Sequence, residues 1–418
     1  MAQGQNAQTL AYQYEKVVPR IALLFQRDHT LFDKIEKREN LETISSRAMR
    51  IPLDLLAGGK LRQVNPDGGD FGRGSAITAD YAQISSVFFA FAVEFSKLME
   101  VATDSNDKAV EPAAKRNLEA AIDQFRTGIE ALLNSDGSGT LDTVVSVTPP
   151  NIITVNNANQ FFDNQDIQVF SALGTSSQGT VTVQSVDAIN KQIVLTGPYP
   201  VGTTTGYLLV VDGASGVASS SLLGVEYHQA NPGNTGTWLQ LARSSYPGKL
   251  VTPYVNFANA SLTPSKVRLL LQLIRKALGV DVPDVDNLMW HMDLDMEAAW
   301  ENVGLVVTQV IQNQLGGNES EDMLKHNLPT NMAGRPILCS IHALPGRIDG
   351  LCLKHWGRAE TQPIGPLEFG GQQLFPIYGG SGGLSAATIS YLWAGFNIFT
   401  DNPRAGSFGN NIAIPSGY

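Results

Sequence analysis

The sequence has 418 residues, enough for roughly two or three hydrophobic cores, and a globular composition. Hydrophobic residues make up 43% and charged residues only 16%, so we expect much of the surface to be covered by other molecules, including copies of the same chain. The net charge of −10 argues against the basic surface that specific nucleic-acid binding requires. The same net charge is still compatible with an acidic wall that surrounds a nucleic acid and repels it.

Neither the N-terminal stretch of the chain nor its apolar runs indicate export or membrane insertion. The N-terminal stretch MAQGQNAQTLAYQ lacks the basic start and apolar core of a signal peptide. Apolar runs such as VFFAFAVEF are about half as long as a membrane span. The spacing of Cys339 and Cys352 matches no zinc or redox motif, and we interpret both as reduced core residues.

The first hundred residues predict an arm followed by a hairpin. Residues 1–40 contain one short apolar stretch, RIALLFQ, and would be ordered only against other surfaces. Strand-like sequence follows in SSRAMRIPLDLLAGGKL and AITADYAQISSVFFAFAVEFSKLM. Between them, GGKLRQVNPDGGDFGRGS predicts a long glycine-rich tip. Two interpretations of this tip are open: a solvated surface loop, or a loop that docks on a neighbouring subunit.

Residues from Pro112 to Asn134 predict an amphipathic helix about 35 Å long. Pro112 suits its first turn, and Gly137 and Gly139 can adopt the left-handed conformation that closes its end. Its apolar face has helical spacing and comprises Leu118, Ile122, Phe125, Ile129 and Leu132.

Residues 145–220 predict an independent β-barrel or β-sandwich, because short runs of Val, Ile, Thr and Phe alternate with turn sequences. GTVTVQSVDAINKQIVLTG reads as a hairpin. Its candidate core residues are Val181, Val183, Ile193, Val194 and Leu195.

The rest of the chain predicts a two-layer α/β core. TPSKVRLLLQLIRKALG should form a helix with Thr263 as its cap, Pro264 in its first turn and Gly279 at its end. A second helix is expected in DLDMEAAWENVGLVVTQVIQNQLGG. Strands are expected in NLMWHMD, RPILCSIHA and TISYLWAGFNIFTD.

No group of residues predicts a catalytic, cofactor or metal site. His291, Asp293 and Asp295 could be read as a metal site, but residues at this spacing on a strand alternate faces, and an aspartate here suits a helix cap. The glycine-rich stretches lack the Lys-Ser or Lys-Thr of a phosphate-binding loop. We therefore expect a protein that is not an enzyme and has no cofactor.

The order of arm, glycine-tipped hairpin, long helix ending in LLNSDGSGT, and α/β core resembles the major capsid protein of tailed bacteriophages, which has the Hong Kong 97-like fold. RIPLDLLAGGKLRQVNPDGGDFGRGS looks like the extended E-loop of that family, and NLEAAIDQFRTGIEALLNSDGSG looks like its spine helix. HQANPGNTGTWLQLARSSYPG and NMAGRPIL are similar to segments of its core.

The resemblance implies an α+β fold with peripheral and axial domains. Its expected divisions are the N-terminal arm (1–40), E-loop and peripheral strands (41–100), spine helix (101–140), inserted β domain (145–220), return to the peripheral domain (221–260), axial domain (261–375) and C-terminal strands (376–418). It also implies an intersubunit role for the E-loop tip, whose candidate residues are Gly58, Gly59, Lys60, Arg62, Asp67, Asp70 and Arg73.

The implied function is structural. Hexamers and pentamers of the chain would build an icosahedral or prolate phage head around double-stranded DNA, assembled in the bacterial host cytoplasm and found in the virion. Its implied partners are itself, a portal, a decoration protein on the inserted domain, and DNA bound non-specifically; no membrane partner is expected. Because the arm begins at Met1, we expect no cleaved prodomain, so any scaffold would be a separate protein. Lys60 is the one lysine near the tip, and a solvated residue explains it as well as a crosslink does.

Two alternatives stay open. An encapsulin-like compartment would share the fold but enclose protein cargo, and typical encapsulins are shorter and lack the inserted β domain. A carbohydrate-active enzyme could use the β domain as a binding module, which needs carboxylates converging with aromatic residues. Asp163, Asp166, Asp187 and Asp212 form no evident site with the neighbouring aromatic residues.

Overall fold

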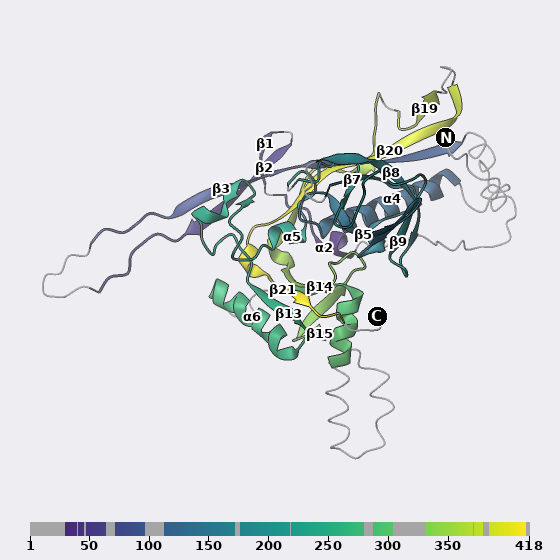
Figure 1. Ribbon diagram of the computed structural model, residues 1–418. Helices are drawn as coiled ribbons and strands as arrows, with labels where there is room; N and C mark the ends of the chain where they lie inside the picture. Colours follow the sequence, from purple (N-terminus) through teal and green to yellow (C-terminus); the bar gives the residue numbers. More distant parts are fainter. Residues whose placement is uncertain are drawn as a thin grey trace, which may run out of the picture.

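The chain folds into an α+β structure in which a hairpin, two sheets and a closed barrel surround one long helix, α4 (Figure 1). A long hairpin extends to the left, a sheet with β19 and β20 reaches the upper right, and a sheet with β13 and α6 lies below. This computed structural model describes residues 30–39, 41–45, 47–63, 72–96, 113–171, 176–217, 219–279, 287–303, 331–370, 372–378 and 384–414.

The hairpin is built on an antiparallel sheet with the order β1 (Glu42–Ser45), β2 (Ala48–Leu56) and β3 (Thr78–Ser85). Strands β2 and β3 pair from Ala48 opposite Ser85 to Leu56 opposite Thr78. Beyond the paired strands, the two arms of the loop continue side by side away from the body (Figure 1). The predicted strands are therefore confirmed, whereas residues 64–71 of the glycine-rich connection lie outside the described residues.

The second sheet is organised by one long strand, β20 (Leu384–Thr400). β18 (Trp356–Pro366) and β19 (Phe375–Tyr378) pair with one side of β20, and β4 (Val87–Ser96) pairs with its other side. Among the described residues, β4 pairs with no second strand and is an edge of the sheet.

The helix α4 (Ala113–Leu133) packs on this sheet, as its apolar stripe predicts. Phe125, Ile129 and Leu132 are buried in one cluster with Phe396 and Ile398 of β20. Leu118 and Ile122 are only half-buried. The helix stops before Gly137 and Gly139, which have φ of 86° and 80°, in the left-handed region that glycine favours.

A closed barrel follows α4, with the strand order β10-β5-β6-β9-β8-β7. Val183, Ile193 and Leu195 lie in its core, and Val181 packs against it. Val194 lies on the other face of β9, contrary to expectation, because side chains alternate along a strand. The strands are β5 (Thr140–Thr148), β6 (Ile152–Val155), β7 (Asp166–Phe170), β8 (Ser177–Asp187), β9 (Gln192–Leu195) and β10 (Leu208–Val211).

The lower unit contains a six-stranded sheet with the order β13-β21-β17-β14-β16-β15 and helix α6 (Pro264–Leu278). Gly279 ends α6 with φ of 76°, as predicted. Thr263 occupies the cap position, but its hydroxyl makes no capping bond and lies 3.2 Å from Ser265 Oγ instead. The strands are β13 (Tyr254–Ala260), β14 (Leu288–Met292), β15 (Asn331–Met332), β16 (Arg335–Cys339), β17 (Ile348–Cys352) and β21 (Ser407–Ile412).

Shorter elements join these units. They are helices α2 (Thr30–Lys34) and α5 (Val225–His228), strands β11 (Thr237–Trp238) and β12 (Leu241–Ala242), and the 3₁₀ turns η1 (Ala158–Gln160), η2 (Arg243–Ser245), η4 (Leu353–His355) and η5 (Pro403–Ala405). Of the second helix predicted after Asp293, residues 294–303 are helical, and the remainder lies outside the described residues.

The chain leaving the barrel returns to the end of α4 through Gly224, where two stretches of backbone meet without a side chain between them. A Cβ atom on Gly224 would lie 2.2 Å from the carbonyl oxygen of Ser135 and 2.6 Å from that of Leu133. Both distances are too short for a carbon atom, and the neighbouring atoms are backbone that cannot rotate away.

We predict that Gly224→Ala lowers the free energy of unfolding by about 1–3 kcal/mol, because the two segments must separate. Denaturant unfolding of the unassembled subunit measures this. Gly197→Ala is the matched control, since a Cβ there meets nothing within 4 Å. Equal stability of the two variants would contradict the close approach at Gly224.

Candidate functional site

The tip of the long hairpin exposes every described residue that the sequence singles out there. Gly58, Gly59, Lys60, Arg62 and Arg73 are all exposed. Asp67 and Asp70 lie outside the described residues. Apolar side chains are exposed as well, and Leu61 between the two basic residues is fully accessible. Such a surface is typical of a contact with another molecule.

The two arms of the tip are held together beyond the last strand pair. The Gly59 amide donates to the carbonyl of Ser75 at 2.7 Å, and the Ser75 hydroxyl donates back to the carbonyl of Gly59 at 3.1 Å. A Cβ on Gly58 would lie 2.7 Å from the Ser75 carbonyl oxygen. Glycine at position 58 therefore lets the two arms approach each other.

Residues 237–250 clamp the root of the hairpin. The amide of Gln83 on β3 donates to the carbonyl of Leu239 at 3.0 Å. The Tyr246 hydroxyl donates to Asp80 at 2.8 Å, and this bond raises the pKa of Tyr246. The clamp shares a buried cluster with Ile51 and Ile84 of the hairpin. The root is thus fixed to the body while the tip extends freely from it.

A buried histidine lies behind the clamp. The indole N–H of Trp238 donates to His228 Nδ1 at 3.2 Å, so the proton of the neutral ring lies on Nε2, which donates to the carbonyl of Ile398 at 3.0 Å. The rings of Tyr227 and Trp356 pack edge-on against it. Burial, assisted by the charge of Arg243, lowers the pKa of His228 to about 3.

The end of the predicted arm packs on α4 of its own subunit. Leu31 and Phe32 of α2 are buried in the cluster that contains the apolar face of α4. Glu130 of α4 is also buried, and its carboxylate accepts the amides of Leu31 at 3.0 Å and Phe32 at 2.8 Å. Glu130 therefore satisfies first-turn amides of α2 that have no partner within that helix.

The last turn of α4 also holds the lower sheet. Asn134 donates from its side-chain amide to the carbonyl of Glu130 at 3.1 Å and accepts from His291 Nε2 at 2.8 Å. His291 is buried on β14. Its ring therefore connects β14 to the helix.

The structure does not bring together His291 and Asp293, which the sequence analysis considered as parts of a metal site. His291 points to Asn134, whereas Asp293 precedes the next helix and accepts the amide of Leu294 at 2.8 Å. Burial, together with the nearby charge of Asp295, raises the pKa of Asp293 to about 6. Among the residues that the structure describes, no group of three His, Cys, Asp or Glu side chains is placed to hold a metal ion.

The barrel is fixed to the lower unit by two amide side chains. Asn157 donates to the carbonyl of Ile341, and Gln160 donates to the carbonyl of His342, each at 2.8 Å. At the barrel entrance, Asp142 accepts the amide of Asn157 at 2.6 Å, while burial raises the pKa of its carboxyl group. The barrel is therefore joined to both α4 and the lower sheet.

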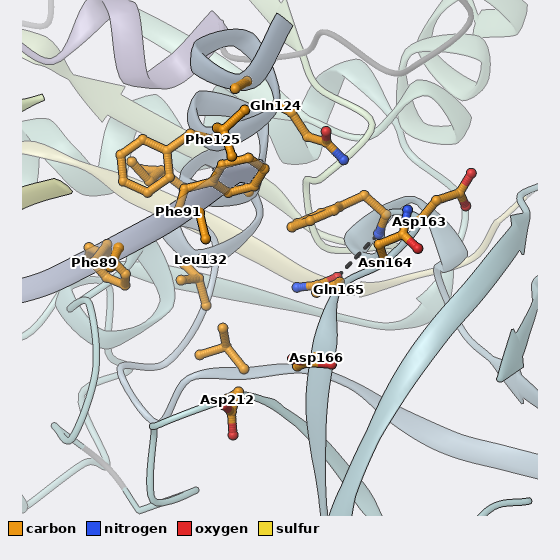
Figure 2. Close-up of a pocket in the computed structure, with 18 of the residues that line it drawn as sticks. Phe89, Phe91, Gln124, Phe125, Leu132, Asp163, Asn164, Gln165, Asp166 and Asp212 are labelled. Carbon is orange, nitrogen blue, oxygen red and sulfur yellow. Dashed lines mark hydrogen bonds between the residues drawn. The ribbon is translucent and has the colours of Figure 1, made fainter. Parts of the chain in front are cut away.

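A cavity of about 650 Å³ lies between β4, α4 and the barrel (Figure 2). Phe91 and Phe125 lie together on one side of it, and Asp166 and Asp212 lie on the other. Three of the four barrel aspartates considered for a carbohydrate site, Asp163, Asp166 and Asp212, line this cavity. Asp187 is instead the last residue of β8 and accepts bonds from Asn190 in the turn that follows.

The sequence did not identify Glu130, His228 or Asn397 as important. Asn397 accepts the amide of Leu223 at 2.9 Å and donates to the carbonyl of Ser85 at 2.8 Å. All of these contacts join residues at least ten positions apart in the chain. Local spacing carries no signal for such contacts, because the partner is determined by the tertiary fold.

Comparison with known proteins gives the fold. No family model and no curated protein matches the sequence. Among solved structures, the chain resembles the capsid of cyanophage A-1(L), with a TM-score of 0.57 and 12% identity over 95% of this chain and 96% of the other. It also resembles the capsid of the native GTA particle, with a TM-score of 0.51 and 11% identity over 95% and 96% of the two chains.

These likenesses establish the class: the chain has the fold of phage-type capsid proteins, the Hong Kong 97-like fold. The predicted resemblance is therefore confirmed at the level of the fold. Within the described parts of the chain, no helix is long and apolar enough to cross a membrane.

Glu130 supports a stability prediction. Glu130→Gln replaces one of the two accepting oxygens with a donor, so one buried amide of α2 loses its partner. We expect the free energy of unfolding to fall by about 1–3 kcal/mol. Hydrogen exchange of residues 31–35 should also accelerate. Glu42→Gln on the exposed strand β1 is the control, and equal effects of the two substitutions would contradict the role of Glu130.

His228 supports a pH prediction. Its pKa is about 3 in the folded state and near its ordinary 6.5 in the unfolded chain, so only the unfolded chain takes up a proton between these values. The stabilisation is complete above about pH 6.5 and is lost as the pH falls toward 3, by about 1.4 kcal/mol per pH unit at most. Denaturant unfolding of wild type and His228→Gln between pH 4 and 7.5 measures this. The wild type should lose more stability in acid than the variant, and parallel pH profiles would contradict the assignment.

Proposed function

We propose that this chain is a structural shell protein that assembles through hexamers and pentamers into an icosahedral or prolate phage head around double-stranded DNA. The observation that carries the proposal is the long hairpin, whose root is clamped and whose tip exposes Leu61 between two basic residues. A hairpin of this kind gains apolar burial only when another molecule covers it. The fold supports the same reading, because it is that of phage-type capsid proteins.

The remaining assignments are part of the same proposal. The N-terminal arm, E-loop, spine helix, inserted β domain and axial domain would occupy the residue ranges given above. Partners would be other copies of the chain, a portal, a separate scaffold if one is used, and a decoration protein on the barrel. A net charge of −10 suits an inner wall along which packaged DNA can move without sticking. The particle would assemble in the bacterial cytoplasm.

A protein compartment that encloses protein cargo is the second candidate, because the same hairpin would join its subunits. The two candidates differ in what the shell contains. Particles purified after nuclease treatment should protect DNA in a phage head and a co-purifying protein in a compartment. No enzymatic role is proposed: Asp163, Asp166 and Asp212 line the cavity beside α4, whereas Asp187 lies apart from them and accepts bonds from Asn190.

Shortening the hairpin tests the proposal. Residues 60–74 can be replaced by Asn-Gly, because the two arms already touch at Gly59 and Ser75 and a two-residue turn can close them. We expect the shortened subunit to unfold at the same temperature as wild type, since the removed residues that the structure describes are all exposed. Shells should nevertheless fail to form or should fall apart at much lower denaturant concentrations, as seen by negative-stain electron microscopy and sedimentation. Shells of normal size and stability would overturn the docking role.

A further inference from the structure

The helix α6 is basic, whereas the chain as a whole is acidic. The stretch from residue 227 to residue 280 has six Lys or Arg residues and no Asp or Glu, so it carries +6 while the rest of the chain carries −16. Four of the six basic residues lie on α6, which has no acidic residue: Lys266, Arg268, Arg275 and Lys276. The positive charge of this stretch is therefore concentrated on one helix.

The basic side chains of α6 lie mainly on its solvent-facing side. Val267, Leu270 and Ile274 are buried under the opposite side of the helix. After the first residue, the exposed residues of α6 form one face, which comprises Ser265, Arg268, Leu269, Gln272, Arg275 and Lys276. The helix lies at the outside of the lower unit, away from the barrel (Figure 1). This exposed face of α6 is thus open to a second molecule.

The chemistry of the exposed face of α6 favours a polyanion over a second protein surface. Arg, Lys, Gln and Ser side chains are hydrogen-bond donors, and they are the groups with which proteins contact nucleic-acid phosphates. The one apolar side chain of the face, Leu269, is 37% exposed. The face has none of the aromatic anchors that are enriched in protein interfaces. Lys266 is not part of it, because its ammonium group lies 4.5 Å from the ring centre of Phe257.

We infer that the exposed face of α6 contacts the phosphate backbone of DNA inside the shell. The inference rests on the proposed function and names the surface of the subunit that faces the interior. Arg268 and Arg275 are seven residues apart, almost two helical turns, so they lie in line about 10 Å apart along the helix axis. Such a row of charges can contact successive phosphates of one strand without reading its bases.

The contact is compatible with the acidic character of the chain. The −16 charge outside the basic stretch repels DNA over most of the wall. Binding that depends on a few basic side chains is weak at physiological salt and is lost further as the salt concentration rises. Each subunit would therefore hold the outermost layer of DNA at one place, and the DNA could still move along the wall between these places.

Neutralising the exposed face of α6 tests the inference on unassembled subunits. The probe is a fluorescently labelled DNA duplex of about 20 base pairs and arbitrary sequence, followed by anisotropy between about 50 and 200 mM salt. The variant Arg268→Gln, Arg275→Gln and Lys276→Gln should bind the duplex about tenfold or more weakly than wild type at the lowest salt. The slope of log K against log salt should also become shallower by about 2–3, because about one counterion is released for each phosphate contact.

A matched control removes the same amount of charge elsewhere. Lys34→Gln, Arg47→Gln and Lys191→Gln neutralise three exposed residues on α2, ahead of β2 and on the barrel. This control should keep the salt slope of wild type. If the two triple variants weaken binding equally, the effect is one of net charge and the inference is overturned. Wild-type subunits that bind no duplex at the lowest salt overturn it as well.

DNA-filled particles provide an independent test. An acetylating reagent small enough to enter the shell should modify Lys276 more slowly in filled particles than in emptied ones, as measured by mass spectrometry. Lys191 on the barrel should react equally in both. Equal modification of Lys276 in filled and emptied particles would show that DNA does not cover α6.

The outcomes separate this inference from the proposed function. If wild type forms no shells with or without the neighbouring genes, the shell function itself is wrong, whatever the affinity of the subunit for DNA. If wild type forms DNA-filled shells but the α6 variant binds the duplex as wild type does, only the inference is wrong. An α6 variant that keeps its affinity for DNA and no longer assembles shows that the face joins subunits, which also overturns the inference.

Discussion

The last turn of α4 is the point on which the rest of the structure depends, because backbone and buried polar groups meet there with little free space. Glu130 holds the first-turn amides of α2, and Asn134 receives His291 from the lower sheet. Gly224 brings the returning chain against the carbonyl of Ser135. Because buried polar groups are costly when unpaired, each contact constrains the others, and the separate units are held in one arrangement.

The fixed arrangement of these units also fixes the position of the hairpin. Its root is fixed by the Leu239 carbonyl, by Tyr246 and by the buried cluster around Trp238, whereas the described residues of its tip, 58–63 and 72–74, are exposed. An exposed tip on a rigid base has a defined position before it binds, so binding loses less entropy than it would for a disordered loop.

Much of the fold follows from local sequence patterns. The stripe from Leu118 to Leu132 predicts α4, Pro264 and Gly279 bound α6, and the glycine-rich segment predicts the hairpin tip. The sequence was less informative where tertiary contacts decide. Thr263 has a good capping side chain that the helix does not use, and Val194 lies on the outer face of its strand because the register of β9 places Ile193 and Leu195 inside. Glu130 and His228 could not be predicted as contacts, since their partners are distant in the chain. The cavity beside α4 combines residues of β4, α4 and the barrel and has no signal in any one of them.

The most direct test of the account is a cryo-electron microscopy map of particles formed by the wild-type chain, expressed alone and together with the neighbouring genes. The account predicts a closed shell in which the hairpin of each subunit crosses to an adjacent subunit and its tip is covered there. A map in which the hairpin faces solvent, or only small discrete oligomers under both conditions, would contradict it.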